Sequence, residues 1–385
     1  MSDTTPTICT FICGRVCALR LVGAARALTK SNDCDSLLYT TYHPQDNLQQ
    51  VLACHGVSPQ YTIILTGHSE EEQVEITKKE LWQGLQRQRP SLLLMAAGSP
   101  LTLAAAQLAR RLGIPVALVY PPLNDELTRL PQQFQRCLWR TSAIAQLHLL
   151  ADERSREYLL EQNPTIGAVD TNRNPGQEDA NDSQAEPNAN NRPGKLSASG
   201  GLGEVAVIGG LAAENVNLVR QLLRADPEMQ QEAERQLPFT HPDTRLLMVA
   251  AIRDDHNPED LAQLCHTIAQ VLEGGCTVVF PVGLKPYLLE TVYKTLPWHP
   301  RLHLLEPLDH LASVQLSERA DAILSDSLAA AEIASSMNKP LFGVGCAAQN
   351  ILNVPVAAPV SAPTTSAHEN LLRACGQFLS GSQAP

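Results

Sequence analysis

The sequence predicts an α/β protein built from two doubly wound parallel-sheet domains. Short, continuously apolar runs recur along the chain and alternate with longer amphipathic stretches. Such runs are typical of strands that are buried on both faces because helices cover both sides of the sheet. A chain of 385 residues that is 44% hydrophobic and 18% charged can also bury two separate cores.

Six apolar runs predict the strands of the first domain, at residues 7–13, 36–41, 61–67, 91–97, 115–120 and 145–151. Amphipathic stretches such as residues 70–88 predict the helices between them. The uncharged stretch at 91–109 approaches the length of a membrane span, but Gly98-Ser99-Pro100 interrupts it. We therefore expect a strand, a turn and a helix there.

A polar segment separates two apolar parts of the chain. Residues 170–203 are rich in Asn, Asp, Gln, Gly, Pro and Ser, and they predict a disordered insertion because they can bury little apolar surface. Apolar runs resume at 205–210, 245–252, 276–283, 301–306, 322–326 and 339–345. We expect an N-terminal domain at 1–169 with its last strand at 204–210, a C-terminal domain at 211–362, and a helix and tail at 363–385.

Net charge and cysteine spacing exclude several classes of function. A formal charge of -11 and a pI near 5.5 argue against nucleic-acid or membrane partners. Ten irregularly spaced cysteines without a secretory leader predict a reduced, cytoplasmic protein. Cys9, Cys13 and Cys17 form a C-x3-C-x3-C run, but Cys9 and Cys13 lie too far apart along a strand to share a metal ion. We expect neither a metal nor another cofactor.

The turn at Asp326 and Ser327 is the strongest candidate site in the sequence. It follows the apolar run 322–326 and precedes an alanine-rich helical stretch, so both residues stand at a helix N-terminus. The free backbone N–H groups of such a terminus can bind a phosphate, although ordinary capping is an alternative for the same pattern.

Residues 301–345 resemble the diphosphate-binding region of non-hydrolysing UDP-N-acetylglucosamine 2-epimerases. The residues that match the family's motifs are Glu306, Pro307, Leu308, Asp309, Asp326, Ser327, Glu332, Lys339 and Pro340. The resemblance extends weakly over nearly the whole chain outside the insertion. It implies two Rossmann-like domains in the GT-B arrangement, with UDP or a UDP-sugar in the cleft between them. It also makes a homodimer reasonable.

The resemblance implies a set of ligand-binding residues. We expect the diphosphate near Ser327, and we expect Arg15 to reach a phosphate across the cleft. The complete set of predicted substrate-binding residues is Asp326, Ser327, Glu332, Arg253, Arg136 and Arg15.

Several positions that the family uses to move the C2 proton differ in this chain. Gly98 and Tyr120 stand where the resemblance places an aspartate and a glutamate, and Ile252 stands at a histidine position. Gln132 and Gln133 replace two glutamates, and an amide cannot act as a base near neutral pH. Among the positions that the resemblance assigns to substrate binding, the second glutamate after Ser327 is also replaced, by Ile333. These changes predict a catalytically impaired nucleotide-sugar-binding homologue.

Two alternatives to an impaired homologue stay open. One is an active sugar-nucleotide epimerase or a glycosyltransferase-like enzyme whose catalytic groups have moved, with Tyr120, Asp254 and His256 as candidates. The other is a non-catalytic interaction protein that recruits a partner through the acidic segment 170–203.

Overall fold

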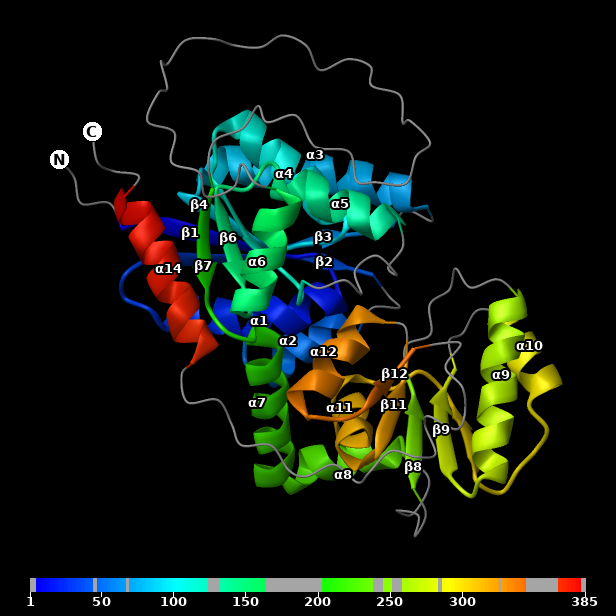
Figure 1. The fold of residues 1–385 in the computed structure, drawn as a ribbon. Helices are drawn as coiled ribbons and strands as arrows, with labels where there is room; N and C mark the ends of the chain where they lie inside the picture. The colour runs from blue at the N-terminus through cyan, green and yellow to red at the C-terminus, as the bar shows by residue number, and fades with distance from the viewer. Residues whose placement is uncertain are drawn as a thin grey trace.

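The computed structural model describes ten segments of the chain, and Figure 1 shows their arrangement as two stacked α/β bodies. The segments are 5–43, 47–66, 69–123, 132–163, 203–237, 245–250, 258–282, 286–325, 327–343 and 366–381. The predicted insertion at 170–203 lies almost wholly outside them, apart from Gly203.

The first body contains a seven-stranded parallel sheet with the order β3-β2-β1-β4-β5-β6-β7. Its strands are β1 (Thr7–Ile12), β2 (Asp35–Tyr42), β3 (Tyr61–Ile64), β4 (Leu92–Ala96), β5 (Val116–Val119), β6 (Leu147–Leu150) and β7 (Glu204–Val207). Its helices before β7 are α1 (Arg15–Lys30), α2 (Leu48–Cys54), α3 (Glu70–Gln88), α4 (Pro100–Leu112), α5 (Gln132–Ser142) and α6 (Glu153–Gln162).

The second body contains a five-stranded parallel sheet with the order β10-β9-β8-β11-β12. Its strands are β8 (Leu246–Val249), β9 (Thr277–Pro281), β10 (Leu302–Leu305), β11 (Ala322–Leu324) and β12 (Leu341–Phe342). The remaining helices are α7 (Leu211–Ala225), α8 (Pro227–Arg235), α9 (Pro258–Glu273), α10 (Pro286–Thr295), α11 (His310–Arg319), α12 (Leu328–Ser336) and α14 (Ala367–Gly381). The predicted fold class, two doubly wound parallel sheets, is confirmed.

The strands form because their side chains are buried on both faces of the sheet. In β1, Ile8 and Ile12 belong to the apolar cluster on one face, whereas Cys9 and Phe11 belong to the cluster on the other face. This arrangement accounts for the continuous apolar runs in the sequence. The same division applies in the second body, where Leu246 and Leu247 of β8 belong to different clusters.

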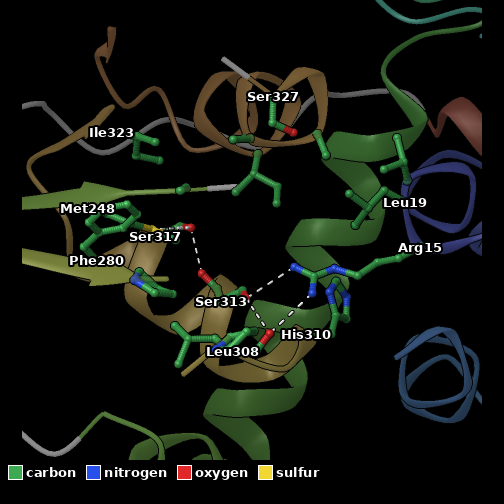
Figure 2. A pocket seen from close by; sticks show the side chains of 17 residues that line it. Arg15, Leu19, Met248, Phe280, Leu308, His310, Ser313, Ser317, Ile323 and Ser327 are labelled. Carbon is green, nitrogen blue, oxygen red and sulfur yellow. Dashed lines mark hydrogen bonds between the residues drawn. The ribbon is translucent and has the colours of Figure 1, made fainter. Parts of the chain in front are cut away.

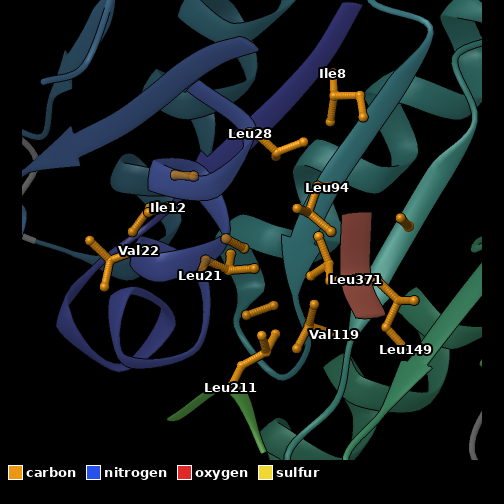
Figure 3. Packing of buried hydrophobic residues seen from close by; sticks show 14 of the residues in the cluster. Ile8, Ile12, Leu21, Val22, Leu28, Leu94, Val119, Leu149, Leu211 and Leu371 are labelled. Carbon is orange, nitrogen blue, oxygen red and sulfur yellow. The ribbon is translucent and has the colours of Figure 1, made fainter. Parts of the chain in front are cut away.

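The C-terminal helix α14 belongs to the core of the first body. It packs against α1, β6 and β7, and Leu371 is fully buried in the cluster that also holds Ile8 and Val119 (Figure 3). Glu214 of α7 accepts hydrogen bonds from the backbone N–H groups of Ala367 and His368, so it caps the start of α14. The end of the described chain therefore completes a core that begins with its first strand.

The stretch at 91–109 forms a strand, a turn and a helix, as predicted. β4 ends at Ala96, Gly98 adopts a φ of 109°, and the Ser99 hydroxyl accepts a hydrogen bond from the Leu101 N–H at the start of α4. None of the helices in the described segments combines the length and the apolar character that crossing a membrane requires.

Candidate functional site

The carboxyl ends of the two sheets contain the positions where open α/β sheets bind ligands. In each sheet the winding direction reverses beside the first strand, between β1 and β4 in the first body and between β8 and β11 in the second. At the second of these points the Ser325 hydroxyl donates a hydrogen bond of 2.5 Å to the Ala250 carbonyl. The Ser327 N–H donates to the Ser325 hydroxyl at 3.0 Å, which fixes the turn into α12.

A cavity of about 250 Å³ lies between α1 and this end of the second sheet (Figure 2). Apolar side chains from both bodies form most of its wall, including Leu19, Met248 and Phe280. Its polar lining residues are Arg15, His310, Ser313, Ser317 and Ser327. The cavity is therefore an apolar pocket with a few convergent polar groups, which is the usual character of a small-molecule site.

Ser327 is the N-cap of α12, but its side chain makes no capping hydrogen bond. The Ser327 carbonyl accepts the Ala331 N–H at 3.0 Å, so the helix begins at the position that the sequence predicted. Because the positive end of the helix dipole adjoins the cavity, an anionic group is favoured there.

Arg15 extends from the first turn of α1 to the second body (Figure 2). Its guanidinium donates to the Leu308 carbonyl at 3.3 Å and to the Ser313 hydroxyl at 3.4 Å. His310 lines the same cavity, and burial, together with the nearby charge of Arg15, lowers the pKa of its imidazole to about 3. The site thus presents one cation and one neutral imidazole.

Glu332 lies on another side of α12 and forms a buried ion pair with Arg20 of α1. The Arg20 Nε and Glu332 Oε1 atoms are 2.7 Å apart, and the two side chains are only 2% and 4% exposed. Arg20 Nη1 also donates to the Ala97 carbonyl at 3.4 Å. Burial raises the pKa of Glu332, and the Arg20 charge opposes this shift. The pair joins the two bodies directly.

The ion pair borders a second cavity of about 260 Å³, which Tyr120 and Asp152 also line. Arg20 Nη2 and Glu332 Oε2 are buried without a hydrogen-bond partner among the residues that the structure describes. The sequence predicted Glu332 as a ligand contact but gave no such prediction for Arg20. The only sequence signal was one arginine among the apolar residues of 16–25, at a position that a helix would bury.

Tyr120 hydrogen-bonds inside the first body. Its hydroxyl lies 2.7 Å from the Ser142 hydroxyl, to which it donates, and 2.7 Å from His148 Nδ1. Burial raises the pKa of the Tyr120 phenol and lowers the pKa of His148 to about 4, so both groups are neutral near pH 7. Nothing in this geometry turns the Tyr120 hydroxyl into a base.

Gly98 stands where the resemblance places an aspartate, and the ring of Phe134 fills the space beside it. A Cβ atom added to Gly98 would lie 2.1 Å from Phe134 Cε2, and the φ of 109° is itself unfavourable for a residue with a side chain. Gln132 and Gln133 lie at the exposed start of α5, where the Gln133 amide donates to Glu70. The local packing therefore suits glycine rather than a carboxylate.

Of the remaining predicted site residues, the structure describes only Arg136. Arg136 is an exposed residue of α5 and lines neither cavity. Asp326, Arg253, Asp254 and His256 lie outside the described residues. Ile333, at the position of the second glutamate, is buried and forms part of the first cavity.

Comparison with known proteins shows which family the chain resembles. A family model described as UDP-N-acetylglucosamine 2-epimerase matches residues 195–345. The chain is therefore similar to this family over part of its length, and curated relatives extend the similarity to most of the chain. It is 24% identical over 332 residues to the UDP-N-acetylglucosamine 2-epimerase of Escherichia coli (strain K12), covering 84% of this chain and 78% of that protein.

Solved epimerase structures share the fold. The UDP-GlcNAc 2-epimerase from Neisseria meningitidis bound to UDP-GlcNAc superposes with a TM-score of 0.71 at 20% identity, covering 98% of this chain and 92% of the other. The Methanocaldococcus jannaschii UDP-GlcNAc 2-epimerase, in complex with UDP-GlcNAc and UDP, gives a TM-score of 0.68 at 17% identity, with coverages of 97% and 92%. Both likenesses support the GT-B-like arrangement that the sequence predicts.

Proposed function

We propose that this chain binds UDP or a UDP-sugar in the first cavity and has lost most of the family's 2-epimerase activity. The binding half rests on the convergence of the α12 N-terminus and Arg15 on one apolar pocket. A cation and the positive end of a helix dipole together favour a diphosphate. The solved relatives named above are described as bound to UDP-GlcNAc or UDP, which supports this ligand class.

The contact between Gly98 and Phe134 is the observation that best supports the loss of activity. A single missing carboxylate could be replaced by a neighbour, but here the ring occupies the space that a side chain at residue 98 would need. Each positioned acid or base contributes roughly 10²- to 10⁴-fold to a rate, so the loss of several should leave little turnover. Gln132, Gln133 and the bonded hydroxyl of Tyr120 support the same conclusion.

The proposed ligand contacts follow from the predicted set. Ser327 and Arg15 line the first cavity, whereas Glu332 lines the second cavity, where it is paired with Arg20, and remains a proposed contact from the resemblance. Asp326 and Arg253 remain proposed contacts from the resemblance alone, and Arg136 is the least supported because it lines neither cavity. A cytoplasmic location and a homodimer stay predictions from the sequence.

Two measurements on the purified chain test the two parts of the proposal, ligand binding and loss of activity, separately. In the first, UDP is titrated while the thermal midpoint is followed, with UMP and ADP as comparison ligands. At a hundredfold excess over Kd the added stability is about 2.7 kcal/mol, which shifts the midpoint by several degrees. No shift with UDP or with UDP-GlcNAc contradicts the binding half.

In the second measurement, the chain is incubated with UDP-GlcNAc in deuterated water, and hydrogen exchange at C2 is followed by NMR. We expect deuterium uptake at C2 to be far slower than in the E. coli relative, which is assayed in parallel as the positive control. Uptake at a rate comparable to that relative, even without accumulation of an epimer, contradicts the loss of activity and favours the alternative with relocated catalytic groups.

A further inference from the structure

Two thiols are in contact at the carboxyl end of β1. The Sγ atoms of Cys13 and Cys17 are 3.4 Å apart. Cys13 Sγ also lies 3.5 Å from the Ser99 hydroxyl and 3.3 Å from the Thr102 hydroxyl. Gly14, between the strand and α1, adopts a φ of 124°, which lets the chain turn sharply enough for the two cysteines to meet.

Cys13 lies beside the N-termini of two helices. It directly precedes Gly14, the N-cap of α1, and its thiol contacts Ser99, the N-cap of α4. The positive ends of two helix dipoles favour a thiolate at this position, and Cys13 is partly exposed to solvent. Cys54, which is also partly exposed, is the last residue of α2, and burial raises the pKa of its thiol to about 11.

Cys17 provides the second thiol of the pair, and this thiol is buried and protonated. It is buried in the first turn of α1, and its contact with Cys13, together with burial, raises the pKa of its thiol well above the usual value. It therefore stays protonated beside Cys13. A disulfide needs a sulfur separation of about 2 Å, so closing the contact requires a movement of little more than about 1 Å.

We propose that Cys13 and Cys17 form a peroxide-sensitive dithiol, with Cys13 as the attacking residue and Cys17 as the resolving residue. The Cys13 thiolate attacks one oxygen of hydrogen peroxide, the O–O bond breaks, and the leaving hydroxide takes up a proton to become water. Cys13 is then a sulfenic acid. The Cys17 sulfur attacks the Cys13 sulfur, the S–O bond breaks, and water leaves with the Cys17 proton. Two thiols lose two electrons in total, and the peroxide gains them.

The tryptic cleavage pattern makes the product easy to identify. Arg15 separates the two cysteines, so trypsin places Cys13 in the peptide 1–15 and Cys17 in the peptide 16–20. The full chain is treated with one equivalent of hydrogen peroxide, its remaining thiols are alkylated, and the digest is analysed without reductant. We expect the two peptides to appear as one species, joined through Cys13 and lacking two hydrogen atoms.

Two variants and one internal comparison make the test decisive. Cys13→Ser should abolish the joined species, and Cys17→Ala should leave Cys13 as a sulfenic acid that dimedone traps. In the untreated protein, Cys13 should be alkylated at least tenfold faster than Cys54. The proposal is overturned if the peptides stay separate, if fragmentation places the link at Cys9 instead, or if Cys13 and Cys54 react at the same rate.

Discussion

Arg20 of α1 and Glu332 of α12 are separated by 312 residues in sequence and form one ion pair inside the protein. The pair spans the two bodies, and both side chains are almost fully shielded from water. Its partners cannot be solvated separately without opening the interface between α1 and α12. Removing either member leaves the other charge buried without a partner, which lowers the free energy of unfolding strongly. The intact pair itself need not contribute much net stability.

We expect Arg20→Met to reduce the free energy of unfolding by about 3–5 kcal/mol, because Glu332 would remain buried without its partner. Arg20→Met/Glu332→Gln should recover part of this loss, since no uncompensated charge remains. Urea denaturation of both variants measures the difference. The exposed pair of Lys78 and Glu75 is the control, and Glu75→Gln should change stability by at most about 1 kcal/mol. Equal losses at the two sites would contradict the prediction.

Gly98→Ala should destabilise the protein more than Gly113→Ala. Both glycines have positive φ values, 109° and 68°, but a Cβ at Gly98 meets the Phe134 ring, whereas a Cβ at Gly113 meets no atom within 4 Å. We expect about 1 kcal/mol for Gly113→Ala and at least about 2 kcal/mol for Gly98→Ala, measured by urea denaturation. Similar values for both would mean that Phe134 moves aside at little cost. In that case position 98 could accommodate a carboxylate.

His310 should make the protein less stable in mild acid. Its pKa is lowered from 6.5 to about 3, so below pH 6.5 the unfolded chain binds a proton that the folded protein does not. Stability therefore falls as the pH falls through this range. Between about pH 7.5 and about pH 5 this single group removes about 2 kcal/mol.

Comparing wild type with His310→Asn isolates that contribution. Arg15, His55 and Asp309 are the ionisable groups that act on His310, and all remain in the variant. His148, whose pKa is lowered to about 4, should still produce a fall of its own. The variant should therefore lose about 2 kcal/mol less than wild type over the same interval. An identical pH dependence in the two proteins would show that the pKa of His310 does not differ between the folded and unfolded states.

Arg15→Ala should weaken UDP binding at least about tenfold, because a hydrogen bond from a charged donor contributes about 1.5–3 kcal/mol. Isothermal titration calorimetry measures the change. Arg156→Ala is the matched control, since Arg156 pairs with Glu153 on the surface of α6 and lines neither cavity. Urea denaturation of Arg15→Ala checks that the loss of its contacts to Leu308 and Ser313 has not unfolded the protein. Unchanged affinity in a folded Arg15→Ala would remove Arg15 from the proposed site.

Local patterns in the sequence sufficed for the strands and for the start of α12. Continuous apolar runs mark strands that are buried on both faces, and Ser327 precedes its helix as the N-cap pattern requires. The break at Gly98-Ser99-Pro100 could be predicted in the same way, because proline fixes its own φ and glycine allows φ values that other residues rarely adopt.

Contacts between distant segments could not be predicted in the same way. A helical pattern shows that Arg20 and Glu332 are each on a buried face, but it does not show that the two faces meet. The filling of the space beside Gly98 by Phe134 depends on how α5 packs near the end of β4. Each of these features depends on tertiary packing rather than on local preference.

The position of α14 has a consequence for how the protein is made. While a ribosome synthesises the chain, β1 and α1 emerge early, but Leu371, Cys375 and Phe378, which cover part of the same apolar cluster, are added only near the end. One apolar flank of the first body therefore stays exposed in the nascent chain until α14 has been synthesised. A truncated product that stops before residue 367 would keep that flank exposed, which makes it a natural client for chaperones and proteases.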